Sequence, residues 1–149
     1  MVHIIGVRIV RVTRSNASIL HSIAPEVFDE PIDAGRLACY LDSPEHLMLV
    51  ALFGDCVVGQ ATGIVQRHPD KHSELFVDEI GVAPDFRKKG VARKMLRELL
   101  ATGEVMGCEE AWVLTEAGNV AAHKLYETAS TSATTVVMYS YRLSGGSPD

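Results

Sequence analysis

The residues with the clearest chemical meaning form a short basic turn at positions 87–90. Arg87, Lys88 and Lys89 precede Gly90, after which apolar residues recur with the spacing of one helix face. The first turn of a helix leaves unpaired N–H groups, which favour an anion together with the helix dipole. Glycine lets a phosphate approach the backbone because it has no Cβ. The pattern predicts a phosphate-binding turn, and a basic surface turn that only begins a helix is the alternative.

Such a turn needs a strand before it and a helix behind it, and the rest of the chain supplies elements of both kinds. Hydrophobic periodicity and turn residues predict strands at residues 7–12, 47–53, 57–66, 75–82, 111–114 and 134–143. Helices are predicted from residue 15 or 16 to 27, and at residues 33–41, 89–102 and 119–128. This order predicts one mixed α/β domain over residues 1–143 and a flexible tail at residues 144–149.

Composition limits the classes of function. The net charge of −5 argues against nucleic acid as a partner and suits a cationic substrate, although solubility alone also explains it. No apolar run is long enough to cross a membrane, and the N-terminus lacks the layout of a signal peptide, so we expect a cytoplasmic protein. The three cysteines lack a CxxC pair and are expected to be small buried residues: Cys39, Cys56 and Cys108.

Two motifs resemble the GNAT family of N-acetyltransferases. Residues 87–92 are similar to its Arg/Gln-x-x-Gly-x-Gly/Ala signature, and residues 119–127 to its Asn-x-x-Ala-x-x-Leu-Tyr-Glu motif. Residues 80–84, apolar-x-Val-x-Pro, also match the strand end that precedes the signature. The resemblance covers the predicted element order of the whole chain. It implies an α/β (α+β) GNAT fold, with a mixed, mostly antiparallel sheet of about six or seven strands flanked by about four helices.

The resemblance also implies the cofactor and its site. The cofactor would be acetyl-CoA, with coenzyme A as product and no metal. The backbone of the strand end would run beside the pantetheine arm, and the turn would hold the pyrophosphate. Tyr126 would be the general acid that protonates the departing thiolate. The residues implied in cofactor binding are Ile80, Gly81, Val82, Arg87, Lys88, Lys89, Gly90, Val91, Ala92, Arg93, Asn119, Ala122 and Tyr126.

Acetyl transfer to an amine requires a base, because an amine is mostly protonated at neutral pH and only its neutral form attacks. Asp78 and Glu79 lie on the strand just before the phosphate-binding turn. Neighbouring strand residues face opposite sides, so both reach one cleft only if the strand carries a bulge. We favour Glu79 as the base, since the resemblance places an acidic residue there in antibiotic acetyltransferases, and Asp78 as the reserve. The alternative is that both carboxylates are solvated or paired with basic side chains.

A closer resemblance is to the aminoglycoside 3-N-acetyltransferases, carried by residues 27–31, 69–71, 74–84 and 111–116. It implies that the acceptor is the 3-amino group of an aminoglycoside, a polycation that carboxylates would steer and orient. Another small amine, a protein N-terminus or lysine, and a non-catalytic acetyl-CoA sensor remain alternatives. The substrate-binding residues so implied are Phe28, Asp29, Glu30, Asp78, Glu79 and Glu116.

Three further expectations concern the remaining chain. The family often has Gly-Phe after Leu-Tyr-Glu, whereas residues 128–134 are small and polar here, so the acceptor wall is expected to be reshaped. His68, Asp70 and His72 lie around Pro69 in a polar segment that predicts a loop and no metal site. Exposed edges of such sheets often pair, so a homodimer is also considered.

Overall fold

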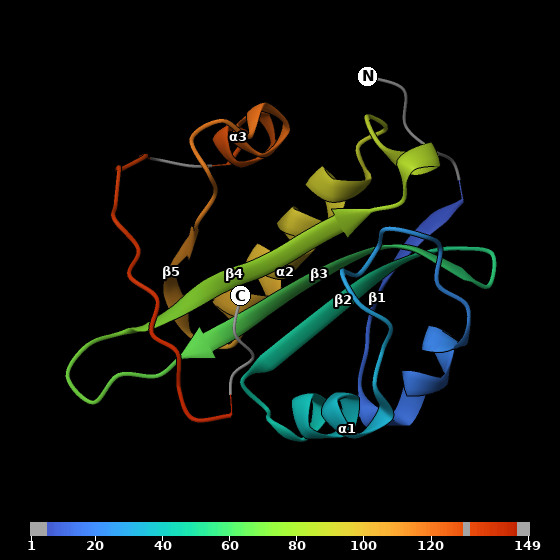
Figure 1. Cartoon of the computed structure of the whole chain (residues 1–149), viewed down its shortest axis with the longest axis horizontal. Coiled ribbons are helices and arrows are strands. Elements are labelled where there is room, and N and C mark those ends of the chain that lie inside the picture. The colour runs from blue at the N-terminus through green and yellow to red at the C-terminus, as the bar shows by residue number, and fades with distance from the viewer. Residues whose placement is uncertain (1–5, 130–131, 146–149) are drawn as a thin grey trace.

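The computed structural model describes residues 6–129 and 132–145, and within them the chain forms one five-stranded sheet (Figure 1). The strand order follows the sequence: β1 (Val7–Arg11), β2 (His46–Phe53), β3 (Cys56–Gln66), β4 (Ser73–Val82) and β5 (Cys108–Val113). β1 to β4 pair antiparallel, while β5 pairs parallel to β4. The predicted mixed, mostly antiparallel fold is confirmed, with five strands in the described residues where about six or seven were expected.

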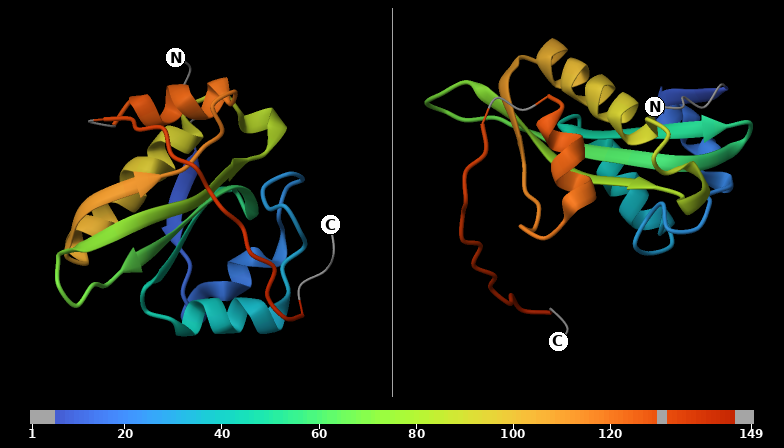
Figure 2. Two further views of the ribbon diagram at one scale, coloured as in Figure 1. Left: turned by 60° about the vertical axis from the view of Figure 1, so that its left-hand side comes forward. Right: turned by 90° about the horizontal axis from the view of Figure 1, so that it is seen from above.

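In the described part of the chain, three α-helices and two 3-10 helices accompany the sheet. They are η1 (Arg14–His21), α1 (Ala34–Asp42), η2 (Pro84–Phe86), α2 (Val91–Val105) and α3 (Val120–Glu127). α2 covers one face of the sheet and α1 lies on the opposite face (Figure 2). Asp33 caps α1, because its carboxylate accepts a hydrogen bond from the Arg36 amide at 2.8 Å. Among the described residues, no helix is long and apolar enough to cross a membrane.

The core lies where α2 packs on the central strands. Helices on both faces bury six of the eight residues of β2, so this strand is a continuous apolar run. Met95 and Leu99 of α2 are fully buried, as is Leu75 of β4. Gly103 lies so close to Leu75 that an added Cβ would be 2.8 Å from that side chain. α2 therefore sits close on β4, which holds the turn at its N-terminus in place at the end of that strand.

The prediction of a helix that runs to residue 27 is wrong, because the structure has only the shorter 3-10 helix η1 there. The backbone beyond it turns aside to pair with β3: Val57 N–H donates to Ser22 O at 2.8 Å, and Ala24 N–H donates to Val57 O at 2.9 Å. Pro25 follows these pairs. Pairing with a distant strand thus replaces the last turns of the helix, and residues 22–33 become a loop beside the sheet.

The C-terminal part also differs from expectation. The strand predicted at residues 134–143 is extended but forms no ladder in the structure, and its side chains are exposed. The strand predicted at residues 111–114 is the exposed edge strand β5, and its Trp112 is 38% exposed. Its ring packs on Phe76, with ring centroids 4.5 Å apart. An edge strand has a neighbour on one side only, so its outer side stays open.

Two smaller expectations have mixed outcomes. Cys108 is buried and Cys56 partly buried, but Cys39 is exposed on α1, which corrects the expectation that all three are buried. Of the predicted tail, residues 144 and 145 form an exposed turn, and residues 146–149 lie outside the described part of the chain. The assignment of residues 1–143 to a single domain stays an expectation.

Candidate active site

A β-bulge brings the two candidate bases to the same point of β4. Thr62 of β3 lies opposite Glu79, but the next residue, Gly63, lies opposite Val77, so Asp78 is the extra residue on β4. Both carboxylates are exposed there. The bulge required for Asp78 and Glu79 to reach one side of the sheet is therefore present, and it lies a few residues before the basic turn.

The loop of residues 22–33 brings a third carboxylate toward Glu79. Partial burial raises the pKa of Glu79, and the negative charges of Asp29 and then Asp78 raise it further. A hydrogen bond from Gln60 acts in the opposite direction. Asp29, Asp78 and Glu79 thus form an acidic cluster built from two separate segments. Such a cluster favours a cationic ligand and gives Glu79 a stronger affinity for a proton than an ordinary glutamate has.

Gln60 is a site residue that the sequence reasoning missed. Its side chain is 2% exposed, and its amide nitrogen lies 3.3 Å from Val27 O and 3.5 Å from Glu79 Oε2. Its amide oxygen is buried and has no hydrogen-bond partner among the described residues. Gln60 therefore links the loop of residues 22–33 to the candidate base. The available signal was an amide in a strand of small and apolar residues, where a buried polar group needs a partner.

The predicted acceptor residues Phe28, Asp29 and Glu30 lie together in this loop. They line an open hollow of about 470 Å³ between the loop and the end of η1, with Leu20 and His21 on its other side. The loop rests directly on β4, because an added Cβ on Gly81 would overlap the Val27 carbonyl oxygen. Gly81, predicted at the cofactor, thus also faces the acceptor loop, and its lack of a side chain allows the close contact.

The backbone of the basic turn has the shape that an anion site requires. Lys88 has φ of 61° and Gly90 has φ of 86°, two left-handed residues just before α2. Turns of this kind can direct successive N–H groups into one concavity. Gly90 is the N-cap of α2, and among the described residues no side chain caps this helix. The first backbone N–H groups of α2 are therefore available to bind a ligand.

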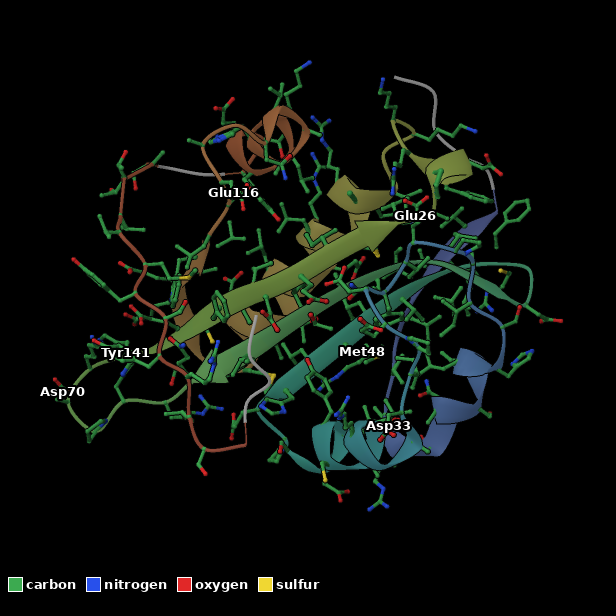
Figure 3. The ribbon with its side chains drawn as sticks, viewed as in Figure 1. Glu26, Asp33, Met48, Asp70, Glu116 and Tyr141 are labelled. Carbon is green, nitrogen blue, oxygen red and sulfur yellow. The ribbon has the colours of Figure 1, made fainter. Side chains whose placement is uncertain are left out.

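The side chain of Arg87 points back toward the body of the domain. Its Nε donates to Val82 O at 2.9 Å, and its Nη2 lies 3.9 Å from Glu26 Oε1. Figure 3 shows Glu26 near the end of β4. Arg87 therefore fastens the turn to the strand end and to the acceptor loop, so the predicted pyrophosphate contact would come from the backbone rather than from this guanidinium.

A basic hollow of about 310 Å³ lies beside the N-terminus of α2. Two of its residues are held by backbone carbonyls: Lys89 Nζ donates to Asp85 O at 2.9 Å, and Lys94 Nζ donates to Val7 O at 3.3 Å. Lys94 and Arg97 were not predicted here. Arg97 lies four residues after Arg93 on the same helix face, so its spacing would have placed it near the predicted residue. The lining consists of Val7, Lys89, Gly90, Val91, Arg93, Lys94 and Arg97.

α3 carries the second motif. The helix predicted at residues 119–128 is present as α3, and Asn119 is its N-cap, because its Oδ1 accepts a hydrogen bond from the Ala122 amide at 3.0 Å. Tyr126 is partly buried against the core, and burial raises its pKa above the ordinary value for tyrosine. The phenol therefore keeps its proton at neutral pH, which a general acid requires. The roles of Asn119, Ala122 and Tyr126 toward the cofactor stay predictions.

Two predicted groups of residues do not join the acidic cluster. Glu116 lies in the exposed connection before α3, where its carbonyl accepts hydrogen bonds from Asn119 and His123, and Figure 3 shows it well away from Glu26. His68 and His72 turn to different carboxylates, Glu74 at 3.0 Å and Glu109 at 3.3 Å. Within the described residues, no three histidine, cysteine or carboxylate side chains are placed so that they could hold a metal ion.

Known proteins share this architecture. A family model described as the acetyltransferase (GNAT) family matches residues 16–129. No curated protein sequence matches the chain significantly. Among solved structures, an aminoglycoside acetyltransferase from an uncultured soil metagenomic sample, in complex with sisomicin, is 18% identical with a TM-score of 0.78, over 93% of this chain and 97% of that one.

Two further solved structures show the range of proteins with this fold. Aminoglycoside acetyltransferase AAC(6')-Iy, in complex with the bisubstrate analogue CoA-S-monomethyl-acetylneamine, is 19% identical with a TM-score of 0.75, over 92% of this chain and 99% of that one. A protein of Bacillus halodurans described as a transcriptional regulator is 14% identical with a TM-score of 0.72, over 91% and 99%. At these identities the likeness shows the fold alone.

Proposed function

Because the chain belongs to the acetyltransferase (GNAT) family, we propose that it transfers an acetyl group from acetyl-CoA to a primary amine of a small polycation, with an aminoglycoside as the acceptor. The observation that carries the acceptor class is the acidic cluster of Asp29, Asp78 and Glu79, formed where β4 bulges beside the loop of residues 22–33. A polycation supplies the charges that such a cluster lacks.

The residues at the start of α2 fit a coenzyme A pyrophosphate. Hydrogen-bond donors and positive charge occur together there. The donors are the uncapped N–H groups of α2, which the left-handed Gly90 leaves open, and the charge comes from the basic hollow beside them. Residues 87–92 would hold the pyrophosphate through their backbone, and Lys89, Arg93, Lys94 and Arg97 would add charge beside it. When bound, acetyl-CoA supplies the acetyl group as an activated thioester.

Glu79 is the base in this proposal. Its carboxylate takes the proton of the acceptor ammonium, directly or through a water molecule, and the neutral amine then attacks the acetyl carbonyl. The raised pKa of Glu79 makes the carboxylate a better proton acceptor than an ordinary glutamate. Asp78 and Asp29 orient the cation beside it, and Gln60 keeps the carboxylate in place.

Tyr126 is the acid. Its phenol gives a proton to the departing thiolate, which leaves as coenzyme A thiol. The position of Tyr126 on α3, in the motif that also caps this helix with Asn119, supports the assignment. The protons of the reaction balance. Glu79 takes one proton from the ammonium and later releases it to solvent, and the nitrogen loses a second proton after the attack, which offsets the proton that Tyr126 gives to the thiolate.

The position of the acetylated amine is the open part of the proposal. The sequence motifs favour the 3-amino group, whereas AAC(6')-Iy has a designation that refers to the 6' position. The loop of residues 22–33 borders the acceptor hollow, so it should decide which amine reaches Glu79. We keep the 3-amino group as the expected site and treat the 6'-amino group as the competing outcome.

An acceptor panel tests this function. Coenzyme A thiol release would be measured with gentamicin, sisomicin and kanamycin, and with spermidine and a peptide bearing a free N-terminus and a lysine. We expect turnover with aminoglycosides, and NMR of the product would identify the acetylated amine. Turnover confined to the peptide would overturn the acceptor assignment. Tight acetyl-CoA binding without turnover on any acceptor would instead indicate a sensor.

A further inference from the structure

Tyr40 is a partly buried tyrosine of α1 whose hydroxyl contacts the sheet beside the bulge of β4. The hydroxyl donates a hydrogen bond to Leu47 O at 2.7 Å and lies 3.5 Å from Gly63 O. Leu47 of β2 and Gly63 of β3 lie opposite each other in the sheet. Gly63 is also the residue at which the pairing of β3 with β4 shifts, which leaves Asp78 as the extra residue. A side chain from α1 therefore contacts the backbone at the bulge that brings the two candidate bases together.

The other face of Gly63 packs against the layer formed by α2. An added Cβ on Gly63 would lie 3.1 Å from the side chain of Leu75 and 3.4 Å from that of Leu99 on α2. The Gly63 backbone therefore has little room to move toward α2. A bulge disrupts the hydrogen bonds between strands locally, so the strands depend at this point on contacts from outside the sheet. α2 supplies such contacts on one face, and Tyr40 of α1 supplies them on the other.

The ring of Tyr40 is fixed in its direction. It stacks on the imidazole of His46, with ring centroids 4.7 Å apart and an angle of 28° between the ring planes. Leu37 and Leu41 of the same helix pack against the core. Packing and stacking together hold the hydroxyl at one point of the sheet, and this is what a residue that positions others requires.

The hydroxyl stays a hydrogen-bond donor at this point. Burial raises the pKa of Tyr40 above the ordinary value for tyrosine, and the negative charges of Asp78 and then Glu79 raise it further. The phenol therefore lies within the electric field of both carboxylates, and it is neutral at the pH at which they are ionised. Its hydrogen is directed to Leu47 O. Tyr40 thus acts on the two carboxylates through the backbone and takes no part in the proton transfer itself.

We propose that Tyr40 is a positioning residue whose hydroxyl holds the β3–β4 bulge in the register that keeps Asp78 and Glu79 at the same point of the sheet. Without the hydroxyl, the Gly63 backbone loses its support on the α1 face, and Asp78 moves away from Glu79. The negative charge of Asp78 helps to raise the pKa of Glu79, so this movement lowers that pKa. The kinetic part of this inference rests on the proposed function, in which Glu79 is the base.

Two variants of the full chain test the role of the hydroxyl. Tyr40→Phe removes the hydroxyl and keeps the ring that stacks on His46. Leu41→Val is the matched control, because it loosens the packing of the same helix and leaves the hydroxyl in place. The charged groups that face Glu79, which are Asp29 and Asp78, stay unchanged in both variants, as does His46 beside Tyr40.

The measurements are the pKa of Glu79 from carbon-13 NMR titration, the KM values for kanamycin and acetyl-CoA, and the melting temperature. We expect Tyr40→Phe to lower the pKa of Glu79. It should raise the KM for kanamycin about fivefold, the size expected for one lost hydrogen bond, and leave the KM for acetyl-CoA unchanged. Leu41→Val should lower the melting temperature without either effect.

The pKa of Glu79 decides the outcome. An unchanged pKa in Tyr40→Phe overturns the proposal, because the bulge would then keep its register without the hydroxyl. Equal shifts of the pKa in Tyr40→Phe and Leu41→Val overturn it as well, since helix packing alone would then explain them. If the wild type acetylates no amine, the proposed function fails, while the pKa of Glu79 in the two variants still tests the role of Tyr40.

Discussion

Gly81 of β4 and Val27 of the acceptor loop are in such close contact that a Cβ on Gly81 would overlap the Val27 carbonyl oxygen. The contact holds residues 22–33 against the strand that carries Asp78 and Glu79. The acceptor loop and the candidate base are therefore positioned by the same glycine, which is also a predicted neighbour of the cofactor.

Gly81→Ala should displace the acceptor loop. Overpacking at a rigid backbone contact costs about 1–3 kcal/mol, because a carbonyl cannot rotate away as a side chain can. We expect the KM for the acceptor to rise about tenfold or more, measured by steady-state kinetics, together with a lower melting temperature. Gly118→Ala is the matched control, since a Cβ there meets nothing within 4 Å. Equal effects of the two changes would contradict the role of the contact.

Gln60→Met should move the pH profile of the reaction. The amide of Gln60 donates to Glu79 and lowers the pKa of that carboxyl. Without this donor the pKa of Glu79 rises further, so the acid limb of kcat/KM should move to higher pH. At a fixed pH on the acid limb, activity should fall about fivefold, the effect of about 1 kcal/mol. Thr62→Val removes another buried polar group from β3 and should leave the acid limb in place.

Glu79→Gln should lower activity and raise stability. Loss of a general base reduces kcat by about 10²–10⁴-fold, while acetyl-CoA binding, followed by calorimetry, should persist. Since the pKa of Glu79 is raised in the fold, the folded state binds this proton more tightly than the unfolded chain. The ionised carboxylate therefore destabilises the fold above that pKa, and this effect disappears as the pH falls through it.

Thermal melting at two pH values separates these effects. Glu79→Gln should melt higher than wild type at pH 7.5, and the difference should shrink near pH 4. Glu98→Gln, on the exposed side of α2, is the control for a lost charge. If Asp78→Asn abolishes turnover and Glu79→Gln does not, Asp78 is the base and our assignment is reversed.

Tyr126→Phe should lower kcat by about 10²-fold or more without weakening acetyl-CoA binding, because only the hydroxyl is lost. Burial raises the pKa of Tyr126 above the ordinary value for tyrosine. The fall in wild-type kcat that deprotonation of this group causes should therefore lie at higher pH than it would for an exposed tyrosine. Tyr141→Phe changes an exposed tyrosine and should be silent. Unchanged kcat in Tyr126→Phe would remove the general acid from the mechanism.

Gly90→Ala should weaken acetyl-CoA binding about tenfold, measured by calorimetry. Gly90 has φ of 86°, a conformation that costs alanine about 1 kcal/mol, and it lies where the α2 N–H groups would meet the pyrophosphate. Gly54 has φ of 60° in the turn between β2 and β3, with open space around it. Gly54→Ala should cost similar stability and leave binding unchanged, and a similar loss of binding in both would point to strain alone.

The local features of this protein follow from short stretches of its sequence. These features depend on neighbouring residues, so spacing and residue type predicted them. They are the basic turn with Gly90, the helix behind that turn, the helix that begins after Asn119, and the strands of the central sheet. The Asp78–Glu79 pair showed that a bulge would be needed if both were to act, because adjacent strand residues face opposite ways.

Features that depend on pairing between distant segments could not be predicted from neighbouring residues. The backbone of Ser22 and Ala24 pairs with Val57, which shortens the first helix and forms the acceptor loop. The side chain of Gln60 on β3 contacts both Val27 and Glu79. Val27 is 33 positions away from Gln60 in the sequence, and Glu79 is 19 positions away. Residues 134–143 have strand-forming side chains but form no strand in the structure, because a strand exists only where another backbone supplies its hydrogen bonds.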